Sequence, residues 1–248
     1  MPAAPRFYCP APLATGSAVQ LPPGAARHVQ VLRLQPGDPI RLFDNAPAGG
    51  EFDATVHAMG RQSVAVLVGG HNPTQRETGR VITVAIGMPA NERMDWLVEK
   101  ATELGVAVVQ PLMTQHSVVR LSNERSQKRV EHWRGIAIAA CEQCGRNRLP
   151  TLQPPMPLGQ WSGQLETRAD LAPTRLVLSL MAGSRPLRDW LAAEGAPQRP
   201  MVLLCGPEGG LSEAEERSAV AAGFVPVSLG ARVLRSETAA LVALTLVG

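Results

Sequence analysis

The residues best suited to binding a ligand lie in a glycine-rich segment near the carboxyl end of the chain. Residues 206–212 read Gly-Pro-Glu-Gly-Gly-Leu-Ser and directly follow an apolar run at 202–205. In open α/β sheets, ligands bind beyond the carboxyl ends of strands, where glycines let the backbone expose its N–H groups to a ligand. A plain strand-to-helix loop is the alternative, but three glycines and a proline within five residues favour a binding loop.

A second segment has the same placement. Residues 228–239 follow the apolar run at 225–229 and precede an apolar stretch at 236–247 that predicts a helix. Gly230 permits a tight turn there, and Ser236 or Glu237 can serve the start of the helix. If the two strands are neighbours, both loops form one pocket; otherwise they are two unrelated loops.

Several well-known motifs are missing from the sequence. There is no G-x-x-x-x-G-K-[ST] and no G-x-G-x-x-G, which argues against Walker-type nucleotidases, Rossmann dinucleotide sites and the common methyltransferase fold. The sequence also lacks H-E-x-x-H and G-x-S-x-G, which argues against a zincin protease and an α/β-hydrolase. Cys141 and Cys144 form a C-x-x-C without a second ligand pair, so we expect a packed helix face and no metal site.

The elements that must position these loops follow from the apolar pattern. Short apolar runs alternate with helical stretches from residue 80 onward, which predicts a parallel α/β sheet. Ser212 with Glu215 predicts a capping box at a helix start. Residues 1–70 instead show period-two alternation, which is typical of a small β-barrel, and residues 71–80 read as a polar linker.

Charge and hydropathy narrow the setting. The formal net charge is +3, and residues 120–148 carry seven basic side chains against three acidic ones. Such a strip can bind phosphates, although charge alone favours a solvated helix face. Because the sequence has neither a signal peptide nor a stretch of about 18 uncharged apolar residues, we expect a cytoplasmic protein without a membrane span.

Seven segments of the sequence, among them the two loop segments described above, together resemble the RsmE family of ribosomal RNA methyltransferases in the SPOUT superfamily. The resemblance covers essentially the whole chain, with conservative departures at Ala231, Val233 and Ser236, where Pro, Ile and Thr are expected. The segments that carry it are GPEGGLSEAE (206–215), LGARVLRSETA (229–239), ERMDWLVEKATELGV (92–106), SVVR (117–120), CEQCGRNRLP (141–150), RFY (6–8) and HVQVLRLQPGD (28–38).

The resemblance implies a PUA-like RNA-binding barrel at 1–70, a linker at 71–80 and a SPOUT domain at 81–248 whose C-terminal segment threads a trefoil knot. It also implies a homodimer and S-adenosylmethionine held by the knot loops. The implied cofactor-binding residues are Ser179, Leu180, Gly206, Pro207, Glu208, Gly209, Gly210, Ser228, Leu229, Gly230, Val233, Leu234, Arg235 and Ser236.

The implied reaction is methylation of N3 of a decoding-region uridine in 16S ribosomal RNA, within the assembled small ribosomal subunit. Because N3 carries a proton in the neutral base, catalysis needs a base or a cation that stabilises the uridine anion. We assign the cation to Arg235, near O4 or O2 of the base or on the RNA phosphate. Glu142 and Glu237 are candidates for base or orienting group, with helix-end electrostatics as an equal alternative. We assign RNA contacts to Arg6, Arg33, Arg120, Arg146 and Arg148.

Three other functions remain open at this point. A SPOUT enzyme that acts on transfer RNA or on a ribose 2′-hydroxyl would need a similar site. A non-catalytic ribosome-assembly factor would keep the basic strip without needing both glycine loops. A metabolic enzyme that binds a small anion would leave the N-terminal barrel without a role.

Overall fold

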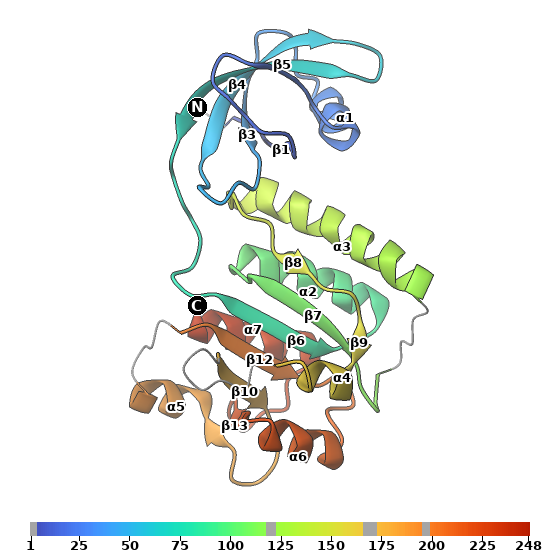
Figure 1. Ribbon diagram of the computed structural model, residues 1–248, viewed down its shortest axis with the longest axis vertical. Helices are drawn as coiled ribbons and strands as arrows, with labels where there is room; N and C mark the ends of the chain where they lie inside the picture. Colours follow the sequence, from blue (N-terminus) through green and yellow to red (C-terminus); the bar gives the residue numbers. More distant parts are fainter. Residues whose placement is uncertain (1–3, 118–122, 166–172, 195–198) are drawn as a thin grey trace. The chain divides into compact units, whose positions relative to one another are not determined.

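The computed structural model describes residues 4–117, 123–165, 173–194 and 199–248. The chain divides into two compact units (Figure 1). Unit 1 comprises Met1–Glu77 and Ile138–Leu149, and unit 2 comprises Thr78–Ala137 and Pro150–Gly248. No helix in the described part of the chain combines the length and the apolar character that crossing a membrane requires.

Unit 1 is built on a five-stranded sheet in the order β1-β3-β4-β5-β2, with β1 and β3 parallel and the other pairs antiparallel. Its core combines inward-facing strand residues with the apolar face of one helix, α1. The elements are β1 (Arg6–Tyr8), β2 (Ala18–Gln20), α1 (Pro23–Val31), β3 (Pro39–Phe43), β4 (Glu51–Met59) and β5 (Val64–Asn72).

The period-two pattern of β4 holds in its centre, where Ala54 and Val56 are buried. Bulges between Phe52 and Ala54 and between Val56 and Ala58 interrupt the register toward both ends. β5 also continues to Asn72, so the structure differs from the expectation that a linker begins at residue 71. The reason is pairing, because Asn72 lies opposite Glu51 in the ladder, a contact that polar composition does not reveal.

Unit 2 contains an eight-stranded sheet in the order β11-β13-β10-β12-β6-β7-β8, with β9 beside β7, and every pair is parallel (Figure 1). The predicted parallel α/β sheet is therefore confirmed. Its strands are β6 (Ile82–Gly87), β7 (Val108–Met113), β8 (Thr151–Leu152), β9 (Met156–Pro157), β10 (Thr174–Leu178), β11 (Arg185–Pro186), β12 (Met201–Cys205) and β13 (Val225–Ser228).

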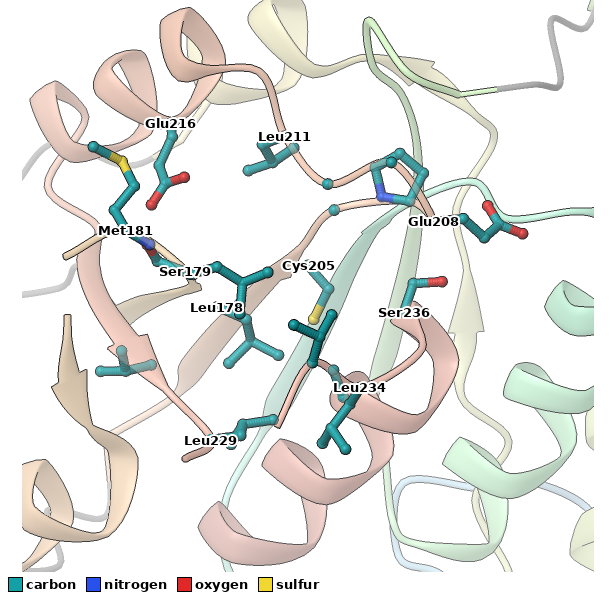
Figure 2. A pocket seen from close by; sticks show the side chains of 18 of the residues that line it. Leu178, Ser179, Met181, Cys205, Glu208, Leu211, Glu216, Leu229, Leu234 and Ser236 are labelled. Carbon is teal, nitrogen blue, oxygen red and sulfur yellow. The ribbon is translucent and has the colours of Figure 1, made fainter. Parts of the chain in front are cut away.

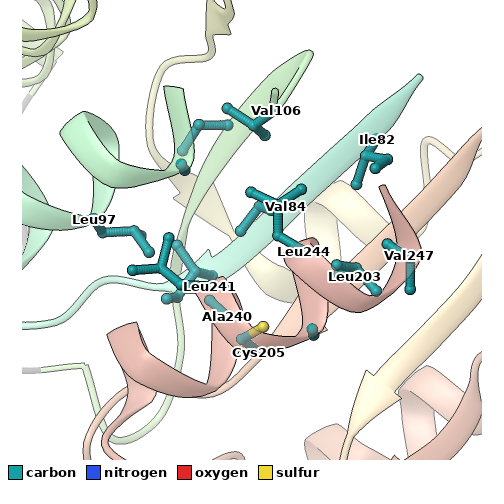
Figure 3. Packing of buried hydrophobic residues seen from close by; sticks show 14 of the residues in the cluster. Ile82, Val84, Leu97, Val106, Leu203, Cys205, Ala240, Leu241, Leu244 and Val247 are labelled. Carbon is teal, nitrogen blue, oxygen red and sulfur yellow. The ribbon is translucent and has the colours of Figure 1, made fainter. Parts of the chain in front are cut away.

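Helices cover both faces of this sheet, because successive strand residues point to opposite sides. Leu203 and Cys205 of β12 pack on the face that carries α7, together with Val84 of β6 (Figure 3). Val202 and Leu204 pack on the other face, against α4 and α6. The helices are α2 (Asn91–Glu103), α3 (Asn123–Cys144), α4 (Leu158–Ser162), α5 (Leu187–Glu194), α6 (Glu213–Ala221) and α7 (Ser236–Val247), and α7 confirms the helix predicted at 236–247.

The cysteines are all free thiols. Cys141 packs in unit 1 against Tyr8 and Phe43, and burial raises the pKa of its thiol to about 12. Cys205, at the end of β12, is also buried, and burial raises its pKa to about 12. The described residues contain no group of three or more His, Cys, Asp or Glu side chains arranged to hold a metal ion.

These raised pKa values make an alkylation experiment informative. The thiolate is the reactive species, so we expect Cys141 and Cys205 to resist iodoacetamide at pH 8 in the folded protein and to react fully in guanidinium chloride. Peptide mass spectrometry would measure both states. Rapid labelling of Cys141 in the folded chain would contradict its assignment to a packed helix face.

Candidate functional site

A pocket of about 370 Å³ opens at the carboxyl edge of three neighbouring strands of unit 2 (Figure 2). β10 lies between β12 and β13, so the loops that follow these strands lie close together. The pocket is lined by Leu178, Ser179, Leu180, Met181, Cys205, Gly206, Pro207, Glu208, Gly209, Gly210, Leu211, Glu213, Glu216, Val227, Leu229, Gly230, Arg232, Val233, Leu234, Ser236 and Ala239.

The loop after β12 is a tight turn that depends on glycine. The N–H of Gly210 donates to the carbonyl of Pro207 at 2.9 Å, and Gly210 adopts a φ of 71°. A Cβ on Gly206 would lie 2.7 Å from the backbone of Gly210 and Leu211, closer than real Cβ atoms come to backbone. The backbone therefore packs against itself here and leaves its outer side open to the pocket.

Helix α6 begins directly after this loop with the predicted capping box. The Ser212 hydroxyl accepts from the N–H of Glu215, and the Glu215 carboxylate accepts from the N–H of Ser212 at 2.9 Å. The Glu215 carboxylate also accepts from the N–H of Gln115 at 2.8 Å. These contacts fix the helix start, and with it the direction in which the glycine loop leaves β12.

Ser212→Ala removes one half of the capping box. We expect the free energy of unfolding to fall by about 1 kcal/mol, because the amide of Glu215 loses its partner. Urea unfolding would measure the change. Ser218→Ala, at an exposed position of the same helix, is the matched control and should leave stability unchanged or slightly raised.

Glu208 connects the glycine loop to helix α2. Its carboxylate accepts from the N–H of Ala90 at 3.0 Å, where α2 has no side-chain cap of its own. The Arg93 guanidinium lies 3.6 Å from Glu208 and 4.0 Å from Glu237 in the first turn of α7. One arginine thus joins two of the segments that surround the pocket.

The loop after β13 supplies the opposite wall. Gly230 has a φ of 104°, which suits glycine and lets the chain turn away from the strand. Arg232 and Val233 are exposed at the pocket, and the loop ends at Arg235, the backbone N-cap of α7. Ser236 and Glu237 are buried in the first turn of that helix.

The structure brings most of the residues implied for cofactor binding into this one pocket. Ser228 and Arg235 are the exceptions, because neither lines it. Sequence reasoning missed apolar residues that end the strands, such as Leu178, and also Met181 and Glu216. Leu178 could have been found from the sequence, because it stands at a strand end next to the implied residue Ser179. Glu216 was harder to find, because the position of its side chain toward the pocket depends on how far the helix has turned after Ser212.

The two glutamates considered for catalysis lie in different units. Glu142 belongs to unit 1, where it accepts from the N–H of Tyr8 at 3.0 Å and lies 3.6 Å from the His28 ring. Burial raises the pKa of Glu142 above its usual range. Glu237 lies in unit 2 and accepts from the Ser236 hydroxyl at 3.3 Å. Neither lines the pocket. Glu237 lies in the first turn of α7, which fits the alternative of helix-end electrostatics, whereas Glu142 lies near the carboxyl end of α3 and is held by contacts within unit 1.

The arginines assigned to RNA contact divide into buried and exposed ones. Arg6 is largely buried and pairs with Glu51, and Arg146 is 4% exposed and pairs with Glu77 at 2.6 Å. The assignment of RNA contacts to Arg6 and Arg146 is therefore corrected, because carboxylates inside unit 1 already hold both guanidinium groups.

Two of the other three arginines assigned to RNA contact have exposed side chains, so their assignment stays a prediction. Arg33 and Arg148 lie at the surface of unit 1, where Arg148 also donates to the carbonyl of Pro47. Arg120 lies outside the described residues.

The charge of the pocket limits what it can bind. Among the described residues that line it, three are glutamates, Glu208, Glu213 and Glu216, and one is arginine, Arg232. Carboxylates repel phosphate groups, so this pocket suits a neutral or cationic ligand better than a phosphorylated nucleotide. Its exposed backbone and apolar strand ends fit a flat heterocycle.

Comparisons with known proteins agree with this geometry. Residues 76–248 match the model of a family described as an RNA methyltransferase domain. The chain is 35% identical over 218 residues to the ribosomal RNA small subunit methyltransferase E of Synechocystis sp., covering 87% of this chain and 67% of that protein.

Several solved structures are similar over nearly the whole chain, and two of them contain S-adenosyl methionine. One is a ribosomal RNA small subunit methyltransferase E from Neisseria gonorrhoeae bound to S-adenosyl methionine, with 35% identity, a TM-score of 0.89 and coverage of 98% of this chain and 96% of that one. The other is a protein of Legionella pneumophila described as a methyltransferase in complex with SAM, with 35% identity, a TM-score of 0.90 and coverage of 99% and 97%.

Proposed function

The chain belongs to the RNA methyltransferase family that includes the ribosomal RNA small subunit methyltransferases E, and from that premise we propose that it methylates N3 of a decoding-region uridine in 16S ribosomal RNA. S-adenosylmethionine is the cofactor. The observation that carries the proposal is the pocket formed by three neighbouring strand ends, whose glycine loops are the two signature segments.

The residues of the pocket fit this cofactor. S-adenosylmethionine carries a positively charged sulfur and no phosphate, which matches a lining with three glutamates and one arginine. When bound, it supplies a methyl group on a sulfonium that needs little further activation. The loops at 206–210 and 229–234 would hold it through exposed backbone groups, and Leu178 and Leu229 would contact its apolar surface.

The acceptor needs help from the protein, because N3 of a neutral uridine carries a proton. A nearby cation stabilises the base anion that forms when this proton leaves. Arg235 is our candidate: its side chain is exposed at the start of α7, one residue from the pocket-lining Leu234 and Ser236. In-line alignment of the acceptor with the methyl group supplies the rest of the rate enhancement.

The remaining parts of the proposal concern the RNA and the fold. We assign RNA binding to the N-terminal, PUA-like part of the chain, where Arg33 is an exposed phosphate contact, and to Arg148 of the basic strip at 120–148, and we expect salt-sensitive binding. The substrate is the assembled small ribosomal subunit, and the active form is a homodimer.

We also propose that the C-terminal segment of unit 2 forms a trefoil knot. Its support is the path of the chain after β12. The chain passes along α6 on one face of the sheet, reaches β13 beyond β10, and returns as α7 to the opposite face against β6 and β12.

The test is methyl transfer from labelled S-adenosylmethionine to unmodified small ribosomal subunits, with the product nucleoside identified by mass spectrometry. We expect N3-methyluridine at a single position. Label on a ribose, or on transfer RNA only, would overturn the substrate and leave the cofactor assignment intact. Absence of both transfer and cofactor binding would overturn the enzymatic function.

A further inference from the structure

Glu216 is a buried carboxylate in the wall of the pocket. It lies in the first turn of α6, is 8% exposed and lines the pocket. Figure 2 shows its side chain on the same side of the pocket as Met181 and Ser179. Its Oε1 atom is buried and has no hydrogen-bond partner within the described part of the chain.

The neighbouring acids of α6 have other tasks. Glu215 completes the capping box with Ser212, and Glu213 is exposed and pairs with Arg217 at 3.2 Å. Glu216 has neither role, although its position near the helix N-terminus favours a negative charge. Glu216 thus lines the pocket with a carboxylate oxygen that is buried and has no hydrogen-bond partner among the described residues, whereas the carboxylate of Glu213 is exposed to solvent.

A buried carboxylate oxygen without a hydrogen bond costs free energy. Apolar residues such as Leu178 and Leu211 share the lining with it and cannot supply a donor through their side chains. The missing donor therefore belongs to whatever fills the pocket. A ligand with hydroxyl or ammonium groups would turn this cost into a charge-assisted hydrogen bond.

We propose that Glu216 is a cofactor-binding residue whose carboxylate accepts a hydrogen bond from a polar donor of S-adenosylmethionine. The inference rests on the proposed function and assigns a partner to an atom that the fold leaves unsatisfied. The ribose hydroxyls and the α-ammonium group of the cofactor share the required chemistry. Both are present in S-adenosylmethionine, and only the hydroxyls are present in 5′-methylthioadenosine.

Glu216→Gln tests the proposal, because it keeps the shape of the side chain and removes its charge. We expect calorimetry to show about tenfold weaker binding of S-adenosylmethionine to the full-length variant. The unfolding temperature of the free variant should equal or exceed that of the wild type, because a buried charge without a partner has been removed. A cofactor-induced rise in that temperature should become smaller.

The matched control is Glu124→Gln. Glu124 also lies in the first turn of a helix, α3, but is exposed and pairs with Lys128 at 2.9 Å. We expect its affinity for S-adenosylmethionine to stay within about twofold of the wild type, because an exposed pair contributes little. Titration with 5′-methylthioadenosine, which keeps the adenosine part and lacks both the ammonium group and the sulfonium charge, then locates the partner. Equal weakening by Glu216→Gln indicates a donor of the adenosine part, and unchanged affinity indicates the positively charged part of the cofactor.

Two outcomes would overturn the inference. If Glu216→Gln binds S-adenosylmethionine with wild-type affinity, this inference is overturned and the proposed function is not. A lowered unfolding temperature of that variant would then indicate that the carboxylate has a partner within the protein. No binding by the wild-type chain would overturn the proposed function together with this inference. The wild-type titration therefore separates the two failures.

Discussion

Gly206→Ala is expected to weaken cofactor binding roughly hundredfold, a large loss for the addition of a single methyl group. The added Cβ would lie 2.7 Å from the carbonyl carbon of Gly210 and from the backbone nitrogen of Leu211. Neither atom belongs to a flexible side chain, so the turn itself must open. Calorimetric titration with S-adenosylmethionine would measure the loss.

The control is the same substitution where there is space. Gly135 is exposed in helix α3, and a Cβ there would meet no heavy atom within 4 Å. Gly135→Ala should raise the free energy of unfolding by about 0.5–1 kcal/mol and leave cofactor affinity unchanged. Wild-type affinity in Gly206→Ala would show that the turn yields easily and that its tightness does not shape the pocket.

The position of this turn could be predicted because its causes are local. The apolar run before Gly206 is long enough for a buried strand, and the capping box of Ser212 and Glu215 marks the residue at which the next helix begins. A loop between a buried strand and a capped helix follows directly. The order of the strands has no such local cause, so only the structure places β10 between β12 and β13.

Arg6 and Arg146 could not be recognised as internally paired residues for the opposite reason, because their partners are distant in the sequence. Arg6 pairs with Glu51 and Arg146 pairs with Glu77, and these partners are 45 and 69 residues away in the sequence. A charge count along the chain treats such residues as free surface cations. Burial of an arginine depends on a carboxylate that the fold brings to it, and no window of sequence contains both members.

The two-residue strands could not be predicted from the pattern of apolar residues either. β8, β9 and β11 are too short to show a period, and β8 and β9 lie in the proline-rich stretch at 145–174. They exist because longer strands offer free edges, as β7 does to Leu152 and Met156. The longer strands therefore determine which short segments become part of the sheet.

Arg235→Ala should lower the rate of methyl transfer by about 10²–10³-fold while cofactor affinity stays near that of the wild type. The side chain is exposed, does not line the pocket, and makes no hydrogen bond or ion pair with the residues that the structure describes. Its removal should therefore cost the fold little. Single-turnover transfer to small ribosomal subunits, together with a cofactor titration, would measure both effects.

Comparison with other variants separates a specific cation from general positive charge. Arg235→Lys keeps the charge but not the planar, forked group, so we expect partial activity if the guanidinium contacts the base. Arg217→Ala removes an exposed arginine whose partner is Glu213 on the same helix and should retain full transfer. Unchanged transfer by Arg235→Ala would exclude it as the stabilising cation and direct the search to Arg232, which lines the pocket.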